Sequence, residues 1–568
     1  MALIKGIQEK VAEYVHDRYS IPVSTTINHF ESPKHKEYGD ISLPYFYIAK
    51  EKGIDPNVAG EDAVEIQEKY HVDTSATVGP YLNIKIPAEE KTREICEQIR
   101  SEKDGFGRVE GMDGLNIVID YSHPNIAKPF GVGHLRSTVI GNALASMYTH
   151  AGCNVVRINH LGDWGKQFGL LDVAYSMWGD EKELKKDPIL HLYNLYVRIN
   201  KCIEEGDEGL DEKGREAFRR LEQGDEERLD LWRKFRELSV KEFKQVYTRL
   251  GITFDSYNGE AFFNDKMEGT MSRLQEAGIL AESRGAQIVD LEDEGLPAAI
   301  IRKSNGSTTY LTRDLSAAEY RYETYSFDSM LYVVGQPQEL HFRQLFAILK
   351  KMGYEWTERM EHVMFGYIQG MSTRKGTIIF LDDVLEEAKS RVLKQMDELF
   401  IQKVTGADKE KAAEDIGITA VLFSDMKNRR IKDIDFDWDR MLSLRGDTGP
   451  YLQNVLARIF GIFRKAPVSV PEDGMDWSLL NEKKAQEVVD ALREFPDVMK
   501  TALSQNEPSV ITGYLLSLAA VFHSAYDVLT VKGSRDEIAQ ARLLLFDCVR
   551  QIFMNAFSLL GFRILEEM

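Results

Sequence analysis

Residues 115–168 read LNIVIDYSHPNIAKPFGVGHLRSTVIGNALASMYTHAGCNVVRINHLGDWGKQF, and this stretch decides the fold. It opens with an apolar run at 117–119 that is typical of a buried strand, and Ser137 and Thr138 are suitable N-caps for the following helix. Gly152 is expected to end that helix, and residues 154–159 to form the next strand. The pattern predicts a βαβ unit, which binds its ligand at the carboxyl ends of the strands, against the helix N-terminus.

The loop between the first strand and the helix has the composition of a phosphate site. Gly131 and Gly133 allow the backbone to approach a phosphate closely, and Lys128 and His134 can neutralise its charge. The loop contains neither GxxxxGK(S/T) nor GxGxxG, because Gly133 is followed directly by His134. We therefore expect a nucleotide site that differs from both of those phosphate loops.

Two blocks of this stretch resemble a known family. GVGH at 131–134 resembles the HIGH-type motif of class I aminoacyl-tRNA synthetases, and the blocks at 122–138 and 159–169 resemble arginyl-tRNA synthetases in particular. A four-residue match alone is weak, whereas two matching blocks of this length are specific. The resemblance covers nearly the whole chain. It implies that ATP activates L-arginine to arginyl-adenylate, with Mg²⁺ assisting, and that the arginine is then transferred to the 3′ end of tRNA(Arg).

Composition sets outer bounds on the class of protein. The 568 residues are 43% hydrophobic and 29% charged, which indicates a soluble globular protein of three or four domains. The start of the chain does not resemble a signal peptide, and no apolar run approaches the ~18 residues of a membrane span. We expect a cytoplasmic monomer without a membrane partner. The four cysteines form no CxxC pair, so neither a structural zinc nor a disulfide framework is expected.

The net charge of −20 opposes binding of nucleic acid unless the chain has a local basic face. Residues 427–432, with four cationic side chains, are one candidate, and the alternative is an ordinary surface cluster.

The order of elements along the chain predicts three domains. Residues 1–110 form a small α/β domain with helices at 4–19 and 41–53 and a strand at 81–86. Residues 111–406 form a doubly wound, Rossmann-like domain, interrupted by a helical insertion at about 180–290. Its second half contains strands at 329–335 and 362–368 around a helix at 339–351. Residues 407–568 are all-helical. The resemblance implies that the first domain binds tRNA, the second is catalytic and the third binds the anticodon.

The sequence MSTRKG at 371–376 is a second candidate phosphate loop. Its cations, flanked by glycines, could close over the β- and γ-phosphates of ATP, and the alternative is a solvated basic hairpin. The sequence resembles the second class I motif, KMSKS, in a divergent form. Gly370 and Thr373 replace its lysines, so either Arg374 or Lys375 carries the charge.

A guanidinium substrate requires a planar, anionic, bidentate acceptor and favours an aromatic face. Residues 309–314 supply Tyr310 and Asp314. The alternative for Asp314 is a helix N-cap, with 316–319 as another capping box. The resemblance assigns arginine binding to five residues: Asp120, Asn125, Tyr310, Asp314 and Gln338.

The resemblance also implies the remaining site residues. The catalytic residues would be Lys128, His134, Arg374 and Lys375. ATP would be bound by Gly131, Gly133, His134, Met371 and Ser372, and tRNA by Tyr451, Tyr526 and Met568. No metal ligands are expected among the side chains.

Gly131 replaces the first histidine of the HIGH-type motif. One hypothesis is that His123 folds back and supplies the missing imidazole to the ATP phosphates. Its alternative is that His123 is an exposed loop residue and that the backbone N–H groups at 131–133 suffice.

Two other functions stay open. A synthetase-like paralogue that binds tRNA or a regulatory ligand without catalysis is favoured by Gly131 and by the missing lysines of the second motif. Another nucleotidylyltransferase on the same fold is disfavoured by the long helical C-terminal part.

Overall fold

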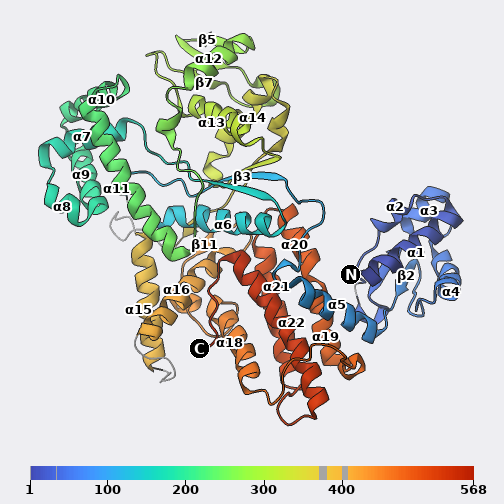
Figure 1. Cartoon of the computed structure of the whole chain (residues 1–568). Coiled ribbons are helices and arrows are strands. Elements are labelled where there is room, and N and C mark those ends of the chain that lie inside the picture. Colours follow the sequence, from blue (N-terminus) through green and yellow to red (C-terminus); the bar gives the residue numbers. More distant parts are fainter. Residues whose placement is uncertain (1, 34, 129, 370–379, 399–406) are drawn as a thin grey trace. The chain divides into compact units, whose positions relative to one another are not determined.

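The structure is a computed structural model that describes residues 2–33, 35–128, 130–369, 380–398 and 407–568 (Figure 1). The chain divides into two compact units. The first unit comprises residues 1–106, 458–495 and 517–554, and the second comprises 107–457, 496–516 and 555–568.

An antiparallel strand pair is the centre of the N-terminal part of the first unit. β1 (Ile41–Pro44) pairs with β2 (Tyr81–Ile84), and apolar side chains of strands and helices share one core. The predicted helix over 41–53 is partly wrong, because the strand β1 forms before α3 begins at Phe46. The helices are α1 (Ala2–Tyr19), α2 (Val23–Ile27), α3 (Phe46–Lys52), α4 (Ala59–Tyr70), α5 (Ala88–Glu102) and α19 (Lys483–Arg493).

A four-stranded parallel sheet organises the second unit. Its strand order is β4-β3-β8-β9, with β3 (Asn116–Asp120), β4 (Asn154–Ile158), β8 (Ser329–Tyr332) and β9 (Met360–His362). The chain leaves β3 toward β4 and leaves β8 toward β9, so the connections diverge between the two central strands. Doubly wound sheets bind ligands at such a switch point, at the carboxyl ends of the strands.

Helices cover both faces of this sheet. In Figure 1, α6 (Leu135–His150) lies on one side of β3, and α13 (Tyr310–Tyr325) and α14 (Glu339–Lys351) lie on the other. Apolar side chains of α13 and α14 share a core with Val118 and Met330. Because successive residues of a strand face opposite sides of the sheet, Ile117 and Ile119 face away from α13 and α14.

The insertion after β4 is helical, as predicted, and leads to a small antiparallel sheet of order β5-β6-β7. The elements from β4 to β7 are α7 (Lys166–Trp178), α8 (Glu181–Lys186), α9 (Pro188–Glu204), α10 (Glu208–Glu222), α11 (Glu226–Leu250), α12 (Met267–Glu276), β5 (Leu280–Ser283), β6 (Ala286–Val289) and β7 (Ala299–Arg302).

The remainder of the chain is mainly helical, as predicted. Two short strands, β10 (Ile368–Gln369) and β11 (Ile434–Asp435), pair in parallel. The predicted strand at 362–368 is therefore wrong: its ends belong to different sheets. The helices are α15 (Leu381–Glu398), α16 (Ala407–Met426), α17 (Trp438–Met441), α18 (Gly449–Lys465), α20 (Phe495–Ser504), α21 (Ser509–Tyr526) and α22 (Asp536–Leu560).

The predicted N-caps of α6 are wrong. A 3₁₀ turn at 132–134 starts the helix earlier, at Leu135. The hydroxyl of Ser137 donates instead to the carbonyl of Val333 at 2.6 Å, and that of Thr138 to the carbonyl of His134 at 2.7 Å. Both side chains are buried inside α6, where tertiary packing and the preceding turn provide their partners.

Two helices, α21 and α22, are long and apolar enough by length and composition to cross a membrane. Their most apolar windows have mean hydropathies of 1.3 and 1.5, and 44% and 72% of those windows are buried. The prediction concerned uninterrupted apolar runs, whereas α21 and α22 pass because their mean hydropathy is high over 18 residues that include polar ones. Core helices of helical domains pass the same test, so two such helices are weak evidence for a membrane.

Candidate active site

The carboxyl end of β3 presents Asp120, which is only 3% exposed. Arg321 Nη2 lies 2.8 Å from one carboxylate oxygen, and His123 Nε2 lies 2.9 Å from the other. The backbone N–H of His160 also donates to Asp120 at 3.3 Å. Burial alone would raise the pKa of Asp120, but Arg321 and His123 together lower it below its usual range. Asp120 is therefore an ionised carboxylate with partners on both oxygens.

The loop after β3 is held in an unusual backbone conformation. Ser122, His123 and Ala127 have positive φ values of 82°, 52° and 57°, which non-glycine residues adopt at a cost of about 1–3 kcal/mol each. Two side chains of α11 hold it: Tyr247 pairs with the Ser122 hydroxyl at 2.7 Å, and the Ser239 hydroxyl accepts from the Ala127 N–H at 3.0 Å. The helical insertion thus stabilises the strained loop.

Asn125 lies against the segment that follows β4. The N–H of Ile126 donates to the carbonyl of Gly162, and the N–H of Gly162 donates to the carbonyl of Pro124. A Cβ at Gly162 would lie 2.3 Å from Asn125 Oδ1, so a side chain at 162 would displace Asn125. This close approach explains the glycine in the second sequence block.

The nucleotide loop contains a neutral histidine. The His134 ring stacks on Phe130 with a centroid distance of 5.5 Å and an interplanar angle of 9°. Burial, helped by the positive charges of His123 and Lys128, lowers the pKa of His134 to about 4. Its Nδ1 is buried without a hydrogen-bond partner among the described residues. This pKa favours a neutral imidazole, which can still offer a hydrogen bond, so the role of His134 at a phosphate stays a prediction.

Lys128 is the cation of this loop. It is half-buried, and burial lowers its pKa. Its Nζ lies 4.9 Å from the ring centroid of Tyr196 in α9. In the part of the chain that the structure describes, no carboxylate lies within ion-pair distance of Lys128, so its charge is not neutralised by a neighbour.

Residues on both sides of the second motif are anchored. Before it, β10 pairs with β11, and after it, Phe380 forms an antiparallel bridge with Gly131. The N–H of Leu381 donates to the carbonyl of Phe130 at 2.8 Å. The predicted site residues of the motif itself lie outside the described residues: Met371, Ser372, Arg374 and Lys375.

Asp314 is not a helix cap. α13 begins at Tyr310 with Thr309 as its N-cap, so Asp314 lies in the second turn. Its Oδ2 accepts a hydrogen bond from His341 Nε2 at 2.7 Å. The Ser316 hydroxyl donates to the carbonyl of Thr312, which also rules out the alternative capping box. Asp314 is free to serve as an acceptor in a site.

The other predicted arginine ligands lie in the same unit. Tyr310 is 61% exposed at the start of α13, and its hydroxyl lies 3.5 Å from where a Cβ on Gly165 would be. Gln338 is exposed at the end of the short turn that links β8 to α14. Arg321 connects the two predicted carboxylates electrostatically, because its charge lowers the pKa of both Asp120 and Asp314.

Glu260 is a site residue that the sequence did not reveal. Burial raises its pKa to about 8, and the nearby charges of Asp314 and Asp163 act in the same direction. Arg313 Nη1, at 3.8 Å, only partly opposes this shift. Glu260 Oε2 has no hydrogen-bond partner among the described residues. No local pattern around Glu260 resembles a motif; only its burial and the influence of Asp163 and Asp314 on its pKa mark it as a candidate.

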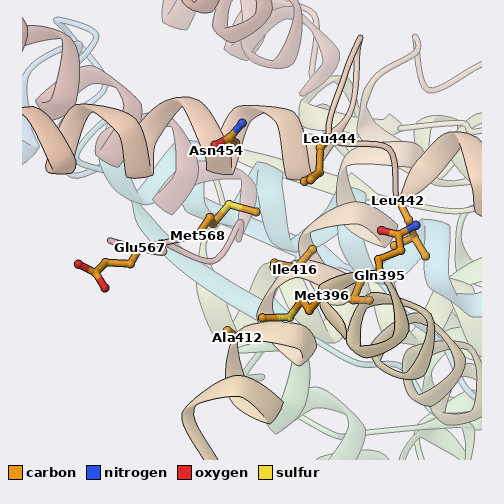
Figure 2. Close-up of a pocket in the computed structure, with 10 residues that line it drawn as sticks. Gln395, Met396, Ala412, Ile416, Leu442, Leu444, Asn454, Glu567 and Met568 are labelled. Carbon is orange, nitrogen blue, oxygen red and sulfur yellow. The ribbon is translucent and has the colours of Figure 1, made fainter. Parts of the chain in front are cut away.

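The residues predicted to contact tRNA are divided between the two units. In the first unit, Tyr526 is 37% exposed, and its ring lies tilted against the buried ring of Phe522, with 5.8 Å between the centroids. In the second, Tyr451 is half-buried in α18, and Met568 lines an apolar pocket of about 160 Å³. In Figure 2 the Met568 side chain lies near Ile416, whereas Glu567 points away.

The basic segment at 427–432 is partly used inside the protein. Arg430 donates to the carbonyls of Met364, Gln505 and Asn506, at 3.0–3.3 Å. Lys427 Nζ donates to the carbonyl of Asp447 at 3.3 Å. Arg430 is therefore a structural residue, and the segment offers less cationic surface than its sequence indicates.

The parallel sheet, its switch point and the nucleotide loop after β3 are those of a class I tRNA synthetase. Residues 98–438, more than half of the chain, match the family model described as tRNA synthetases class I (R), catalytic domain. Residues 452–568 match the DALR anticodon binding domain.

The chain belongs to the arginine–tRNA ligase family. It is 44% identical to the arginine–tRNA ligase of Exiguobacterium sibiricum over 95% of both chains, and 42% identical to that of Lactobacillus acidophilus over 99% of this chain and 100% of the other. The Thermus thermophilus arginyl-tRNA synthetase, at 22% identity, has the same fold, with a TM-score of 0.81 over 99% of this chain and 100% of that one. The predicted family and fold class are confirmed.

Proposed function

We propose that the protein is an arginine–tRNA ligase that activates L-arginine with ATP and transfers it to the 3′ end of tRNA(Arg). The observation that carries this proposal is the 42–44% identity to arginine–tRNA ligases over 95–99% of the chain. The carboxylates at the carboxyl edge of the sheet are consistent with a cationic substrate. A cytoplasmic location, a monomer and domain boundaries near 110 and 406 remain predictions.

In the first step, a carboxylate oxygen of arginine attacks the α-phosphorus of ATP, and the bond to the β-phosphate oxygen breaks. Pyrophosphate leaves, and arginyl-adenylate remains. In the second step, a hydroxyl of the terminal ribose of tRNA attacks the arginyl carbonyl carbon, and AMP leaves. Neither step requires a nucleophile from the protein, so catalysis rests on positioning and on electrostatic stabilisation.

In this proposal, the residues divide between the two substrates. Lys128 contacts the phosphates of ATP, with Gly131 and Gly133 offering backbone N–H groups and His134 a neutral imidazole. Arg374 or Lys375 supplies the second cation, since the segment that carries them returns to the nucleotide loop at Phe380. Met371 and Ser372 belong to the same segment and contact ATP.

The guanidinium is bound by Asp314, with Glu260 as a second carboxyl and Tyr310 as an aromatic wall. Gln338 belongs to the same side-chain pocket, and Asn125 orients the α-amino and carboxylate groups. Asp120, whose oxygens already have partners, supports the loop that carries Asn125 and adds negative potential.

Mg²⁺ is proposed to arrive bound to ATP. Among the described residues, no three His, Cys, Asp or Glu side chains cluster as metal ligands, and the loop at 128–134 contains no carboxylate. The described side chains therefore offer no set of ligands for a resident metal. Tyr451, Tyr526 and Met568 are proposed to contact unstacked bases of tRNA.

The test is aminoacylation of total tRNA with each labelled amino acid, with and without ATP. We expect ATP-dependent charging with arginine alone. Charging with another amino acid would contradict the specificity, whereas tight tRNA binding without any charging would favour a non-catalytic paralogue.

A further inference from the structure

One helix of the insertion contacts both the nucleotide loop and Phe380, which pairs with that loop. α9 begins with Pro188 after the N-cap Asp187, and it buries its apolar face through Leu192, Leu195 and Ile199. A neighbouring face carries Tyr193 and Tyr196, which are three residues apart and therefore share one side of the helix.

Each of these tyrosines meets a different part of the nucleotide site. The Tyr193 ring lies 6.3 Å from the ring of Phe380, which pairs with Gly131. The Tyr196 ring lies 4.9 Å from Lys128 Nζ. The loop backbone is held separately, by the bond of Ser239 in α11 to the N–H of Ala127. Two helices of the insertion thus hold the loop, one through its backbone and the other through a side chain.

An aromatic partner differs chemically from a carboxylate. A carboxylate would neutralise Lys128 and compete with an incoming phosphate. The face of an aromatic ring attracts an ammonium within about 6 Å but carries no net charge, so it orients the ammonium and preserves its charge. Among the described residues, Lys128 has the ring of Tyr196 and no carboxylate as its partner.

We propose that Tyr196 is a positioning residue for adenylate formation, whose ring holds the Lys128 ammonium where it meets the phosphates of ATP. This inference rests on the proposed function, in which Lys128 contacts ATP. It gives the helical insertion a role in activation: the insertion prepares the cation of the nucleotide loop before ATP binds.

The test compares Tyr196→Leu with Tyr196→Phe in the full-length protein, by arginine-dependent exchange of pyrophosphate into ATP with tRNA present. A cation–π contact is worth roughly 0.5–2 kcal/mol, so kcat/KM for ATP should fall by about 2- to 30-fold in Tyr196→Leu. Tyr196→Phe keeps the ring and should remain near the parent. KM for arginine should be unchanged in both variants.

The insertion offers a matched control. Arg198 in α9 lies over the ring of Trp178 in α7 at 4.2 Å, which is the same type of contact away from the nucleotide loop. Trp178→Leu should lower thermal stability as Tyr196→Leu does, and leave kcat/KM for ATP within about twofold of the parent, since the lost contact does not touch Lys128.

Two further variants, Lys128→Ala and the double variant Lys128→Ala/Tyr196→Leu, separate the role of Lys128 from that of Tyr196. We expect Lys128→Ala to reduce pyrophosphate exchange strongly. Adding Tyr196→Leu to Lys128→Ala should not reduce it further. If Lys128→Ala is impaired but Tyr196→Leu matches Trp178→Leu, the inference is wrong and the proposed role of Lys128 survives. If the effect of Tyr196→Leu persists without Lys128, Tyr196 acts by another route and the inference is also wrong. If Lys128→Ala exchanges normally, the role of Lys128 itself falls, and this inference with it.

Discussion

His341 Nε2 donates a hydrogen bond to Asp314 Oδ2 at 2.7 Å, and this bond joins the start of α14 to the second turn of α13. Burial alone would oppose both charges, but each residue stabilises the charge of the other: the pKa of His341 is raised and that of Asp314 is lowered. Asp314 is therefore an oriented, ionised carboxylate whose second oxygen remains for a ligand. The residue that the sequence offered as a possible helix cap is therefore available to a ligand, and its binding of arginine is a prediction.

The first prediction concerns specificity for arginine. Asp314→Asn should raise KM for arginine by about 30- to 1000-fold, since losing a charged partner in a buried site is worth roughly 2–4 kcal/mol. Discrimination against uncharged citrulline should weaken. Steady-state exchange kinetics with both amino acids would measure this. Unchanged arginine kinetics together with a lower melting temperature would contradict the binding role.

The second prediction concerns stability and pH. The pKa of Glu260 is raised to about 8 by burial, so ionising it costs folding free energy. In the unfolded chain this carboxyl ionises near pH 4.5, so the cost appears above that pH and grows until the folded group ionises near pH 8. Glu260→Gln should therefore stabilise the protein without arginine, with a gain that increases from pH 5 to pH 8. Thermal denaturation across this range would test it. If the stability gained by Glu260→Gln falls as the pH rises, Glu260 is ionised in the folded protein and its charge is balanced by Arg313.

The third prediction concerns a buried ion pair beside the nucleotide loop. Arg136 is 1% exposed, lies 3.3 Å from Asp425, and donates to the carbonyls of Arg430 and Lys432. Arg136→Met should cost roughly 3–5 kcal/mol, since it leaves a buried carboxylate without its partner. Burial already raises the pKa of Asp425 to about 6, so the loss should be smaller at pH 5 than at pH 8.

Urea unfolding at the two pH values measures this loss. Arg136→Met combined with Asp425→Leu should recover part of the stability, because no charge remains buried. An equal loss at both pH values would indicate that the carbonyl contacts of Arg136, and not its charge, dominate.

The fourth prediction concerns the histidine missing at Gly131. The structure shows that His123 is not a free loop residue: its Nε2 is bound to Asp120, which leaves only Nδ1 to face a phosphate. We expect His123→Ala to raise KM for arginine severalfold by releasing Asp120 and the strained loop, and Gly131→His not to restore activity. A fall of about 10²–10³ in exchange rate with unchanged KM for arginine, partly restored by Gly131→His, would instead support a relocated phosphate donor.

The fifth prediction concerns tRNA. Tyr526→Ala should raise KM for tRNA by about 5- to 150-fold, because stacking of a base on an aromatic ring is worth roughly 1–3 kcal/mol. KM for ATP and arginine should not change, and Tyr526→Phe serves as the control that keeps the ring. Equal tRNA kinetics in the two variants would show that Tyr526 only packs on Phe522.

The sequence by itself determined the family and much of the local structure. The strands at 116–120 and 154–158 and the helix at 339–351 follow from apolar periodicity, which reflects local packing on one face. The two long blocks around His134 and Asp163 were sufficient to name the class of enzyme. Both kinds of information lie in continuous stretches of chain.

Only the tertiary structure decided what the polar side chains do. Ser137 bonds the carbonyl of Val333 just after β8, His123 bonds Asp120, and the charge of Asp314 acts on Glu260, although none of these pairings leaves a sequence pattern. The contact of Tyr196 with Lys128 spans 68 positions of the sequence and crosses from the insertion to the core. Burial also decides the charge of His134, because it lowers the pKa of that side chain from 6.5 to about 4. The hydrogen-bond partners and the burial of a side chain depend on which distant segments pack against it. A local sequence pattern does not contain this information, because it arises only when the chain folds.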